Sequence, residues 1–424
     1  MKIFDQIKKA CLLLAVFAVS LTACNKLELD PTPNERPADG TTPTLATLLD
    51  APEFSLLKTV FTKADLLTAL SAPNLRYTLF APDNVAISAS LAPILPPGVT
   101  PEMYIASLDA GSAKALSQYH VIPQEIPAAS IPTAFPNFQY PTLLNPAPSV
   151  SALLRLTTFP SVRSNGAWVN NVPIIATDIE AVNGVMHKVF RLVSPPSRDL
   201  WSRITTDPEL TYLKAAIDRA DTLVVAGRRL QDALNTSVNP AAIASNLTLF
   251  APTNDAVKVF LIGAITQALV AQGADPATAQ AQATALVTGY GSTILSDPAS
   301  IPVYGPTLNA VITPTLAKGI VAYHILSSQS GTYAPPGIRV FSVNLPTVAG
   351  SVKTLLNSAV AVHPGLTVQA TFVSPVPGLS VVAAATVKGL ANATASNIII
   401  GSTSSDLHCV NGVMHKIDQA LIPQ

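Results

Sequence analysis

Seven residues, Val182-Asn183-Gly184-Val185-Met186-His187-Lys188, occur twice in this chain, because the same letters return at 410–416. Asn-Gly between apolar residues is a strong β-hairpin signal, since both residues accept positive φ in a type I′ turn. Side chains alternate along a strand, so Val185, His187 and Val189 are expected to share one face. The sequence therefore predicts that each copy ends in a hairpin with a histidine between two β-branched neighbours.

Four further segments also occur twice, in the same order along the chain. An ordered set of repeated segments indicates two copies of one structural unit. We therefore expect a first repeat at 44–197 and a second repeat at 198–424. The paired segments are 52–58 with 208–214, 77–86 with 247–256, 119–122 with 323–326, and 142–145 with 354–357.

Local signals inside the repeats predict both helices and strands. Pro followed by Glu, at Pro52 and Pro208, is typical of a helix start, where the missing N–H is not needed and the acid complements the helix dipole. Segments 77–82 and 247–252 are expected to form short buried strands that end at a proline. Asp83 and Thr253 follow as N-caps of the next helices.

The second repeat is longer than the first at two places, 262–297 and 358–405. The Ala- and Gln-rich segment 262–297 predicts an additional helix with a break at Gly273, and 358–405 predicts longer strands or loops. The first repeat completes its motifs without such additions, so we expect partner recognition on them. The alternative is that the added helix covers a face of the sheet.

Composition indicates a folded protein. Of 424 residues, 49% are hydrophobic and 12% are charged, and the formal net charge is zero. That content of apolar residues exceeds what disordered chains contain, and the absence of net positive charge argues against nucleic acid as a partner. Three scattered cysteines cannot build a zinc site.

The N-terminus has the pattern of an export signal. Lys2, Lys8 and Lys9 precede an apolar stretch that is too short to span a bilayer, and Leu21-Thr22-Ala23-Cys24 follows. This resembles a bacterial lipobox, which implies cleavage of a signal peptide at 1–23 and lipidation of Cys24; the alternative is an ordinary secretory signal with a chance cysteine. Residues 24–43 contain several prolines and predict a flexible tether.

The ordered motifs Thr-x-Phe-Ala-Pro-x-Asn, Tyr-His and Asn-Gly-Val-x-His, each present twice, resemble those of the fasciclin domain family. The resemblance implies an α+β fold with two tandem domains, each a small twisted β-sandwich or wedge with packed helices. It also implies adhesion or interaction at cell surfaces, with no enzymatic activity, cofactor or metal. The motif residues are Thr78, Phe80, Pro82, Tyr119, His120, Asn183, Gly184 and His187 in the first repeat, and Thr248, Phe250, Pro252, Tyr323, His324, Asn411, Gly412 and His415 in the second.

Two positions depart from the family pattern. Phe190 follows the first hairpin where the family usually has Asp, whereas the second repeat has Asp418, and Asp83 stands where the family usually has Thr or Ser, as at Thr253. The four histidines could suggest a metal or catalytic site, but His187 and His415 lie between β-branched residues. A buried imidazole that bonds to backbone or polar neighbours fits that setting better. Packing is also the expectation for the two Tyr-His pairs, with partner recognition as the alternative.

Two functions remain open from the sequence. The first is a membrane-anchored adhesion or interaction protein that binds a protein or glycan. The second is a ligand-binding lipoprotein that serves uptake of a polysaccharide or a small apolar molecule. An apolar pocket of several hundred Å³ lined by the additions would favour the second. The lipobox predicts a place in the cell envelope, at the outer membrane of a Gram-negative bacterium, on its periplasmic or its outer face.

Overall fold

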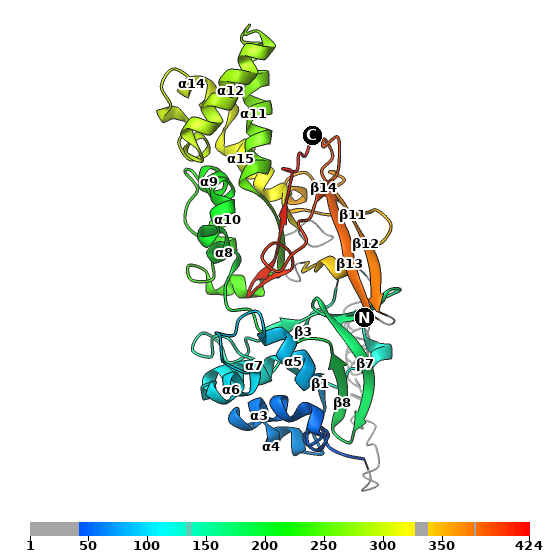
Figure 1. The fold of residues 1–424 in the computed structure, drawn as a ribbon. Coiled ribbons are helices and arrows are strands. Elements are labelled where there is room, and N and C mark those ends of the chain that lie inside the picture. The colour runs from blue at the N-terminus through cyan, green and yellow to red at the C-terminus, as the bar shows by residue number, and fades with distance from the viewer. Residues whose placement is uncertain (1–41, 134, 136, 327–337, 377–378) are drawn as a thin grey trace, which may run out of the picture. The chain divides into compact units, whose positions relative to one another are not determined.

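The computed structural model describes residues 42–133, 135, 137–326, 338–376 and 379–424, and 44–424 form one compact unit. The signal peptide, Cys24 and nearly all of the expected tether lie outside the described residues. The described part mixes helices and strands throughout, which confirms the α+β class (Figure 1).

The first repeat contains a six-stranded sheet with the order β2-β1-β8-β7-β6-β5. β1 and β8 are parallel neighbours at its centre, and the other pairs are antiparallel. A two-stranded sheet, β3 with β4, lies beside it. The strands are β1 (Tyr77–Pro82), β2 (Val121–Ile122), β3 (Tyr140–Pro141), β4 (Thr157–Thr158), β5 (Pro160–Arg163), β6 (Gly166–Val169), β7 (Val172–Ala181) and β8 (Gly184–Val189).

The second repeat divides its strands between two four-stranded sheets. One has the order β10-β9-β16-β15, and the other has the order β11-β12-β13-β14. An isolated bridge between Ile398 and Ile417 joins β16 to the segment after β14. The strands are β9 (Leu247–Pro252), β10 (Ile325–Leu326), β11 (Gly350–Val352), β12 (Leu366–Val376), β13 (Leu379–Lys388), β14 (Ser396–Asn397), β15 (Leu407–Cys409) and β16 (Gly412–Ile417).

Both repeats share one strand core, as the repeated segments predict. The order β2-β1-β8-β7 in the first corresponds to β10-β9-β16-β15 in the second. The central parallel pairs have the same register, because Phe80 lies opposite His187 and Phe250 lies opposite His415. The duplicated motifs therefore occupy equivalent places in the two cores.

The helices of the first repeat begin where the sequence places caps. Asp83, for example, accepts a hydrogen bond from the Ala86 N–H at 2.8 Å, and Pro52 opens a 3₁₀ turn before α3. The elements are α2 (Leu45–Leu48), η1 (Pro52–Phe54), α3 (Ser55–Lys63), α4 (Leu67–Ser71), α5 (Asn84–Leu91), α6 (Pro101–Ser107), α7 (Ala110–Tyr119) and η2 (Ala128–Ser130).

The second repeat has longer helices in the segment that the sequence marks as additional. α11 and α12 form an antiparallel helical hairpin, and Gly273, with φ of +94°, lies in the turn between them (Figure 1). The elements are α8 (Leu200–Thr206), η3 (Pro208–Leu210), α9 (Thr211–Ala220), α10 (Leu230–Leu234), η4 (Pro240–Ser245), α11 (Asn254–Ala271), α12 (Pro276–Tyr290), α13 (Thr293–Ser296), η5 (Pro298–Ser300), α14 (Gly305–Val311), α15 (Pro314–Tyr323), η6 (Ser342–Asn344) and η7 (Leu355–Ser358).

Each central sheet buries both of its faces. In the first repeat, Leu79 and Met186 pack with the helices on one face, while Phe80 and Val189 belong to a second buried cluster on the other. The second repeat repeats this arrangement and adds a third cluster. The residues of that cluster come from α9, α11, α12, α13, α14 and nearby turns, and none comes from a strand. The alternative that the added helix covers a face of the sheet is therefore wrong, because the hairpin packs on other helices.

The expected type I′ turn at Asn-Gly is also wrong, although the hairpin itself is present. Ala181 pairs with Gly184, so Val182 and Asn183 form the turn, and neither has a positive φ. Gly184 lies within β8 at φ of +142°, where a Cβ atom would collide with the carbonyl oxygen of Tyr77 on β1. Glycine is therefore required by the approach of the parallel strand rather than by the turn.

The asparagine of the hairpin joins the strand core to the helices. Asn183 Oδ1 accepts the Leu45 N–H at 2.9 Å, and its Nδ2 donates to the Leu70 carbonyl at 2.6 Å. In the second repeat, Asn411 binds the N–H of Leu200 and the carbonyl of Leu234 in the same way. These buried bonds fix the start of each repeat on its final hairpin.

Polar and apolar contacts link the two repeats. Phe159 and Trp168 of the first form one buried cluster with Phe341 of the second. Asn344 connects the repeats by hydrogen bonds, because its Nδ2 donates to Ser161 Oγ at 2.7 Å and its Oδ1 accepts from Asn137 Nδ2 at 2.7 Å. Buried and hydrogen-bonded contacts of this kind hold two bodies in one arrangement.

Candidate functional site

The hairpin histidine of the first repeat is buried and fully bonded. His187 Nδ1 accepts the Asp178 N–H at 3.3 Å, and Nε2 donates to the Ile126 carbonyl at 2.9 Å. The ring stacks on Phe80 with centroids 5.7 Å apart. Burial lowers the pKa of His187, which favours the neutral imidazole that these two bonds require.

The second repeat reproduces this environment. His415 Nδ1 accepts the Asp406 N–H at 3.2 Å, and Nε2 donates to the Val340 carbonyl at 2.9 Å. Its ring lies 5.8 Å from that of Phe250. Both ring nitrogens of both histidines are used by the backbone, so neither imidazole has a lone pair free for a metal ion.

The motif threonine and histidine act on the same backbone residue. Thr78 Oγ1 accepts the Ile126 N–H at 2.8 Å, while His187 binds the Ile126 carbonyl. Asp178 extends the attachment, because its Oδ1 accepts the Ala128 N–H at 2.8 Å. We call these three side chains, Thr78, His187 and Asp178, the backbone clip of the first repeat.

The second repeat has the same backbone clip, formed by Thr248, His415 and Asp406. Thr248 Oγ1 accepts the Val340 N–H at 2.9 Å, and Asp406 Oδ1 accepts the Ser342 N–H at 2.6 Å. Both aspartates adopt positive φ, at 56° and 53°. The clip fastens the segment after the Tyr-His pair onto the central sheet, which gives these motif residues a structural role.

The histidines of the Tyr-His pairs close the helices that precede the short strands. His120 follows α7, and its Nδ1 donates to the Leu116 carbonyl at 2.8 Å while Nε2 accepts the Val193 N–H at 3.2 Å. Desolvation lowers its pKa to about 4. The Tyr-His pair thus lies at a helix end and not along a strand.

His324 has the same bonds at the end of α15. Nδ1 donates to the Ile320 carbonyl at 2.8 Å, Nε2 accepts the Leu421 N–H at 2.9 Å, and desolvation lowers the pKa to about 4. An imidazole that exchanges both bonds with backbone groups cannot serve as a general base without breaking one of them.

The tyrosines of these pairs also use their hydroxyl groups in hydrogen bonds to the backbone. Tyr119 Oη donates to the Thr157 carbonyl at 3.0 Å, and Tyr323 Oη donates to the Gly365 carbonyl at 2.7 Å. Burial raises the pKa of both phenols. Because both rings have no exposed surface, neither tyrosine is available to a partner in this arrangement.

The last strand of each repeat also carries a lysine in an ion pair. Lys188 Nζ lies 2.9 Å from Asp83 and 3.0 Å from Glu53, next to the cap of α5. Lys416 Nζ lies 2.6 Å from both Asp207 and Glu209. Across the described ranges, no group of three or more His, Cys, Asp or Glu side chains is arranged to hold a metal ion.

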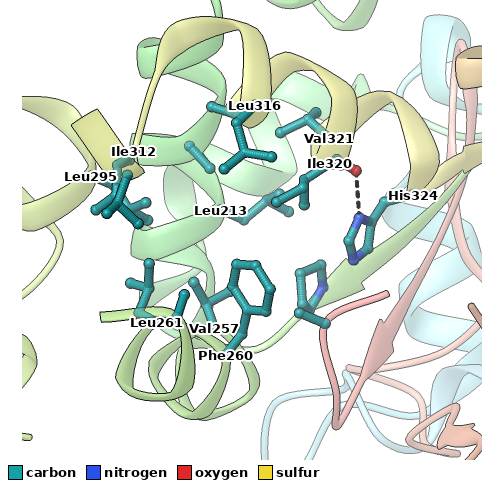
Figure 2. Close-up of a pocket in the computed structure, with 16 residues that line it drawn as sticks. Leu213, Val257, Phe260, Leu261, Leu295, Ile312, Leu316, Ile320, Val321 and His324 are labelled. Atoms are coloured by element: carbon teal, nitrogen blue, oxygen red, sulfur yellow. Dashed lines mark hydrogen bonds between the residues drawn. The ribbon is translucent and has the colours of Figure 1, made fainter. Parts of the chain in front are cut away.

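An apolar pocket lies between α9, α11 and α15 of the second repeat. Figure 2 shows Leu213, Phe260 and Ile320 around it, with His324 at one end bonded to the Ile320 carbonyl. Two lining residues, Ala264 and Leu295, come from the added segment. Its volume of about 70 Å³ is well below the 300–1,000 Å³ of typical small-molecule sites.

The outer surface of the α11–α12 hairpin is short of charge. Asp275 is the only charged residue between Lys258 and Asp297. Val259 is 73% exposed and Val270 is 39% exposed, while the inner face packs into the third buried cluster. Within the described chain, α11 is also the one helix with the length and hydropathy of a membrane span, and 28% of it is buried.

The sequence identified the motif residues, but it did not reveal that Thr78 and His187 both bond to the backbone of Ile126, or that Thr248 and His415 both bond to that of Val340. A signal was present, because Thr, Asp and His recur in both repeats at Thr78, Asp178 and His187 and at their counterparts. The motif asparagines also have a partner that the sequence does not reveal. Asn84 Nδ2 donates to the Pro52 carbonyl and Asn254 Nδ2 to the Pro208 carbonyl, which ties each Pro-Glu helix start to the first residue of the helix that follows the central strand.

A comparison with family models agrees with the motifs of the first repeat. The model of the fasciclin domain matches residues 52–195. The chain is 30% identical over 143 residues to Protein sll1483 of Synechocystis sp. (strain ATCC 27184 / PCC 6803 / Kazusa), which covers 34% of this chain and 68% of that protein. A solved FAS1 domain pair from the insect cell adhesion molecule Fasciclin I is similar at 14% identity and a TM-score of 0.29, over 89% of this chain and 95% of that one.

Proposed function

Because the chain belongs to the fasciclin domain family, whose domains are associated with adhesion and interaction, we propose that it is a membrane-anchored adhesion protein that binds a protein or glycan partner. The observation that carries the proposal is the α11–α12 hairpin. Its residues from 262 onward are an addition to a core that the first repeat completes without them, and its outer surface is nearly free of charge. No catalytic step is assigned, because the duplicated histidines are bonded to the backbone.

A charge-poor outer surface suits an interface because little charge has to be desolvated when a partner covers it. Charged residues are depleted at the centres of protein interfaces for this reason. The apolar inner face of the hairpin packs against α9, α13 and α14. The hairpin therefore does not need a partner to bury this face and to fold. The exposed valines at 259 and 270 therefore contribute to binding rather than to the core.

The test replaces the two exposed valines by Glu, Val259→Glu with Val270→Glu, in cells that express the full chain. We expect attachment of the cells to immobilised envelope extract to fall at least about tenfold, since two charges would have to be buried. The matched control is Leu153→Glu with Val150→Glu, two exposed apolar positions in the first repeat. Unchanged attachment in the hairpin variant, with loss in the control, would show that recognition lies in the first repeat.

The anchor is a separate part of the proposal. Lipidation of Cys24 would hold the protein at the envelope membrane through the segment 24–43, which spans at most about 70 Å when extended. Cys24→Ser should move the protein from the membrane fraction to the soluble fraction after cell lysis. Unchanged membrane partitioning of this variant would rule out the lipid anchor.

The second candidate, uptake of a small apolar molecule, has the apolar pocket of Figure 2 in its favour. Its volume of about 70 Å³ accommodates only a few heavy atoms, so a larger ligand would have to separate α11 from α15. Ala264→Leu would fill this pocket from the added helix. If the variant changes ligand uptake by cells but leaves their attachment intact, the second candidate replaces the first.

A further inference from the structure

A cleft of about 550 Å³ lies between the two repeats, in the size range of small-molecule sites. We call it the inter-repeat cleft. The first repeat contributes Ser90, Trp168, 171–173, 190–192 and Ser194, and the second contributes 342–343, 379–382, 400–402 and 405–406. Residues 379–382, 400–402 and Ser405 belong to the segment 358–405 that the sequence marks as an addition.

The walls of the cleft are held in place by the contacts between the repeats. β13 packs against β7, and Trp168 at the cleft belongs to the buried cluster that includes Phe159 and Phe341. The Asn344 hydrogen bonds to both Asn137 and Ser161 connect the same two bodies. A cleft whose walls are already fixed loses little conformational entropy when a ligand binds.

Phe190 at this cleft is one of the two residues that depart from the family pattern. Its counterpart, Asp418, accepts hydrogen bonds from Ser396 Oγ at 2.9 Å and from the Asn397 N–H at 2.8 Å, and so closes β14 onto the sheet. Phe190 makes no such bond and is 39% exposed, with the Arg191 guanidinium 6.0 Å from its ring centroid. The departure therefore replaces a structural carboxylate with an aromatic surface beside a hydrogen-bond donor.

The remaining lining is rich in hydroxyl groups and nearly neutral. Of the residues that the structure describes, six serines line the cleft, two of them buried (Ser342 and Ser405), and the charged lining residues are Arg191 and Asp406. Both oxygens of Asp406 already accept hydrogen bonds from Ser342, so this carboxylate is committed to the backbone clip. Such a lining matches a neutral ligand with many hydroxyl groups better than it matches an anion.

We propose that the inter-repeat cleft binds a neutral oligosaccharide. One sugar ring stacks on Phe190, because polarised C–H groups are attracted to the negative face of an aromatic ring. The sugar hydroxyls accept from the Arg191 guanidinium and exchange hydrogen bonds with Asn171 and Ser402 at the exposed rim. The inference goes beyond the proposed function, because the cleft contains no residue of the α11–α12 hairpin.

The experiment titrates the full chain in detergent with cellotetraose, xylotetraose and chitotetraose. The chain has two tryptophans, so Trp201→Phe leaves Trp168 at the cleft as the sole indole reporter. We expect a saturable fluorescence change with at least one of the three sugars. No saturable change with any of them up to about 10 mM would overturn the proposal.

Variants then connect binding to the cleft. Phe190→Ala should weaken the affinity at least about tenfold, whereas Phe190→Tyr should keep it within about threefold because it retains the ring. Ser402→Trp, at an exposed position, should abolish binding by filling the cleft, and its affinity is measured by isothermal titration calorimetry because the variant carries an additional indole. The matched control is Phe138→Ala, since Phe138 is 58% exposed and does not line the cleft.

Two outcomes would contradict the assignment. Equal affinities in the wild-type chain, Phe190→Ala and Ser402→Trp would place sugar binding elsewhere. Binding of an uncharged Val/Thr octapeptide in place of the sugars, with the same sensitivity to Ser402→Trp, would identify the occupant as a peptide. Urea midpoints of all variants are measured alongside, so that a loss of affinity in a folded variant is separated from unfolding. Because no cells are involved, failure here leaves the attachment result of the hairpin variants intact.

Discussion

In the first repeat, the ten residues of β7 continue the central sheet through β6 to β5, whereas in the second repeat β15 covers three residues and the long strands β12 and β13 belong to another sheet. The second repeat also carries a third buried cluster of helices. The backbone clips nevertheless have the same bonds to within a few tenths of an ångström. The comparison teaches that additions are tolerated wherever they do not touch the clip, the hairpin asparagine or the central parallel pair.

The largest expected difference between the repeats concerns the hairpin glycines. Gly184→Ala combines a positive φ with a collision against the Tyr77 carbonyl, so we expect a loss of more than about 4 kcal/mol of unfolding free energy. Gly412→Ala has the collision but not the positive φ, and about 2–3 kcal/mol is expected. Urea unfolding measures both, and Gly263→Ala in α11, where a Cβ meets nothing, is the control. A larger loss for Gly412→Ala would contradict the comparison.

Lowering the pH should reduce the stability of both repeats by the same amount, because His120 and His324 become protonated on unfolding. Their folded pKa of about 4 lies below the ordinary 6.5, so the unfolded chain binds more protons between these values and stability falls as pH drops through this window. Going from pH 7 to pH 5 should cost about 2 kcal/mol per imidazole. Urea midpoints at the two pH values test this, and His120→Gln should remove one of the two contributions. A pH response that the variant leaves unchanged would show that other groups, such as His187, His408 or carboxylates, dominate.

Removal of the clip imidazole should affect the two repeats alike. His187→Ala leaves the Ile126 carbonyl and the Asp178 N–H without a partner, and His415→Ala does the same to Val340 and Asp406. A loss of about 1–3 kcal/mol of unfolding free energy is expected for each, the usual cost of a stranded buried group. Wild-type stability in either variant, together with loss of a bound metal, would restore the metal hypothesis.

The smallest effect is expected from the hairpin lysines, and it should differ between the repeats. The Lys188 side chain is 20% exposed, so Lys188→Met should cost less than about 1 kcal/mol. Lys416 is nearly buried between Asp207 and Glu209, and Lys416→Met should cost about 1–2 kcal/mol because a shielded carboxylate loses its partner. Thermal unfolding at low and high salt compares the two. Equal losses of stability that do not depend on salt would indicate that the packing of the lysine methylene groups, and not the ion pair, determines the effect in both variants.

Several local features could be predicted because they depend on neighbouring residues. The cap at Asp83 and the break at Gly273 follow from chemistry within one helical turn, and the structure has them where the sequence places them. The hairpins could be predicted from the alternation of side chains on either side of Asn-Gly, but the type of turn could not. Its register depends on β1, which lies more than a hundred residues earlier and forces a glycine at 184 by close approach.

The sequence alone determined that two copies of one unit follow each other, and which residues mark the equivalent places. It could do so because repetition, periodicity and capping are properties of neighbouring residues. Only the tertiary structure decided that Thr78 and His187 act on one residue, Ile126, that the added hairpin builds its own core, and that Phe190 faces a cleft completed by the second repeat. Each of these depends on contacts between distant segments, which are set by the packing of the whole fold and leave no pattern along the chain.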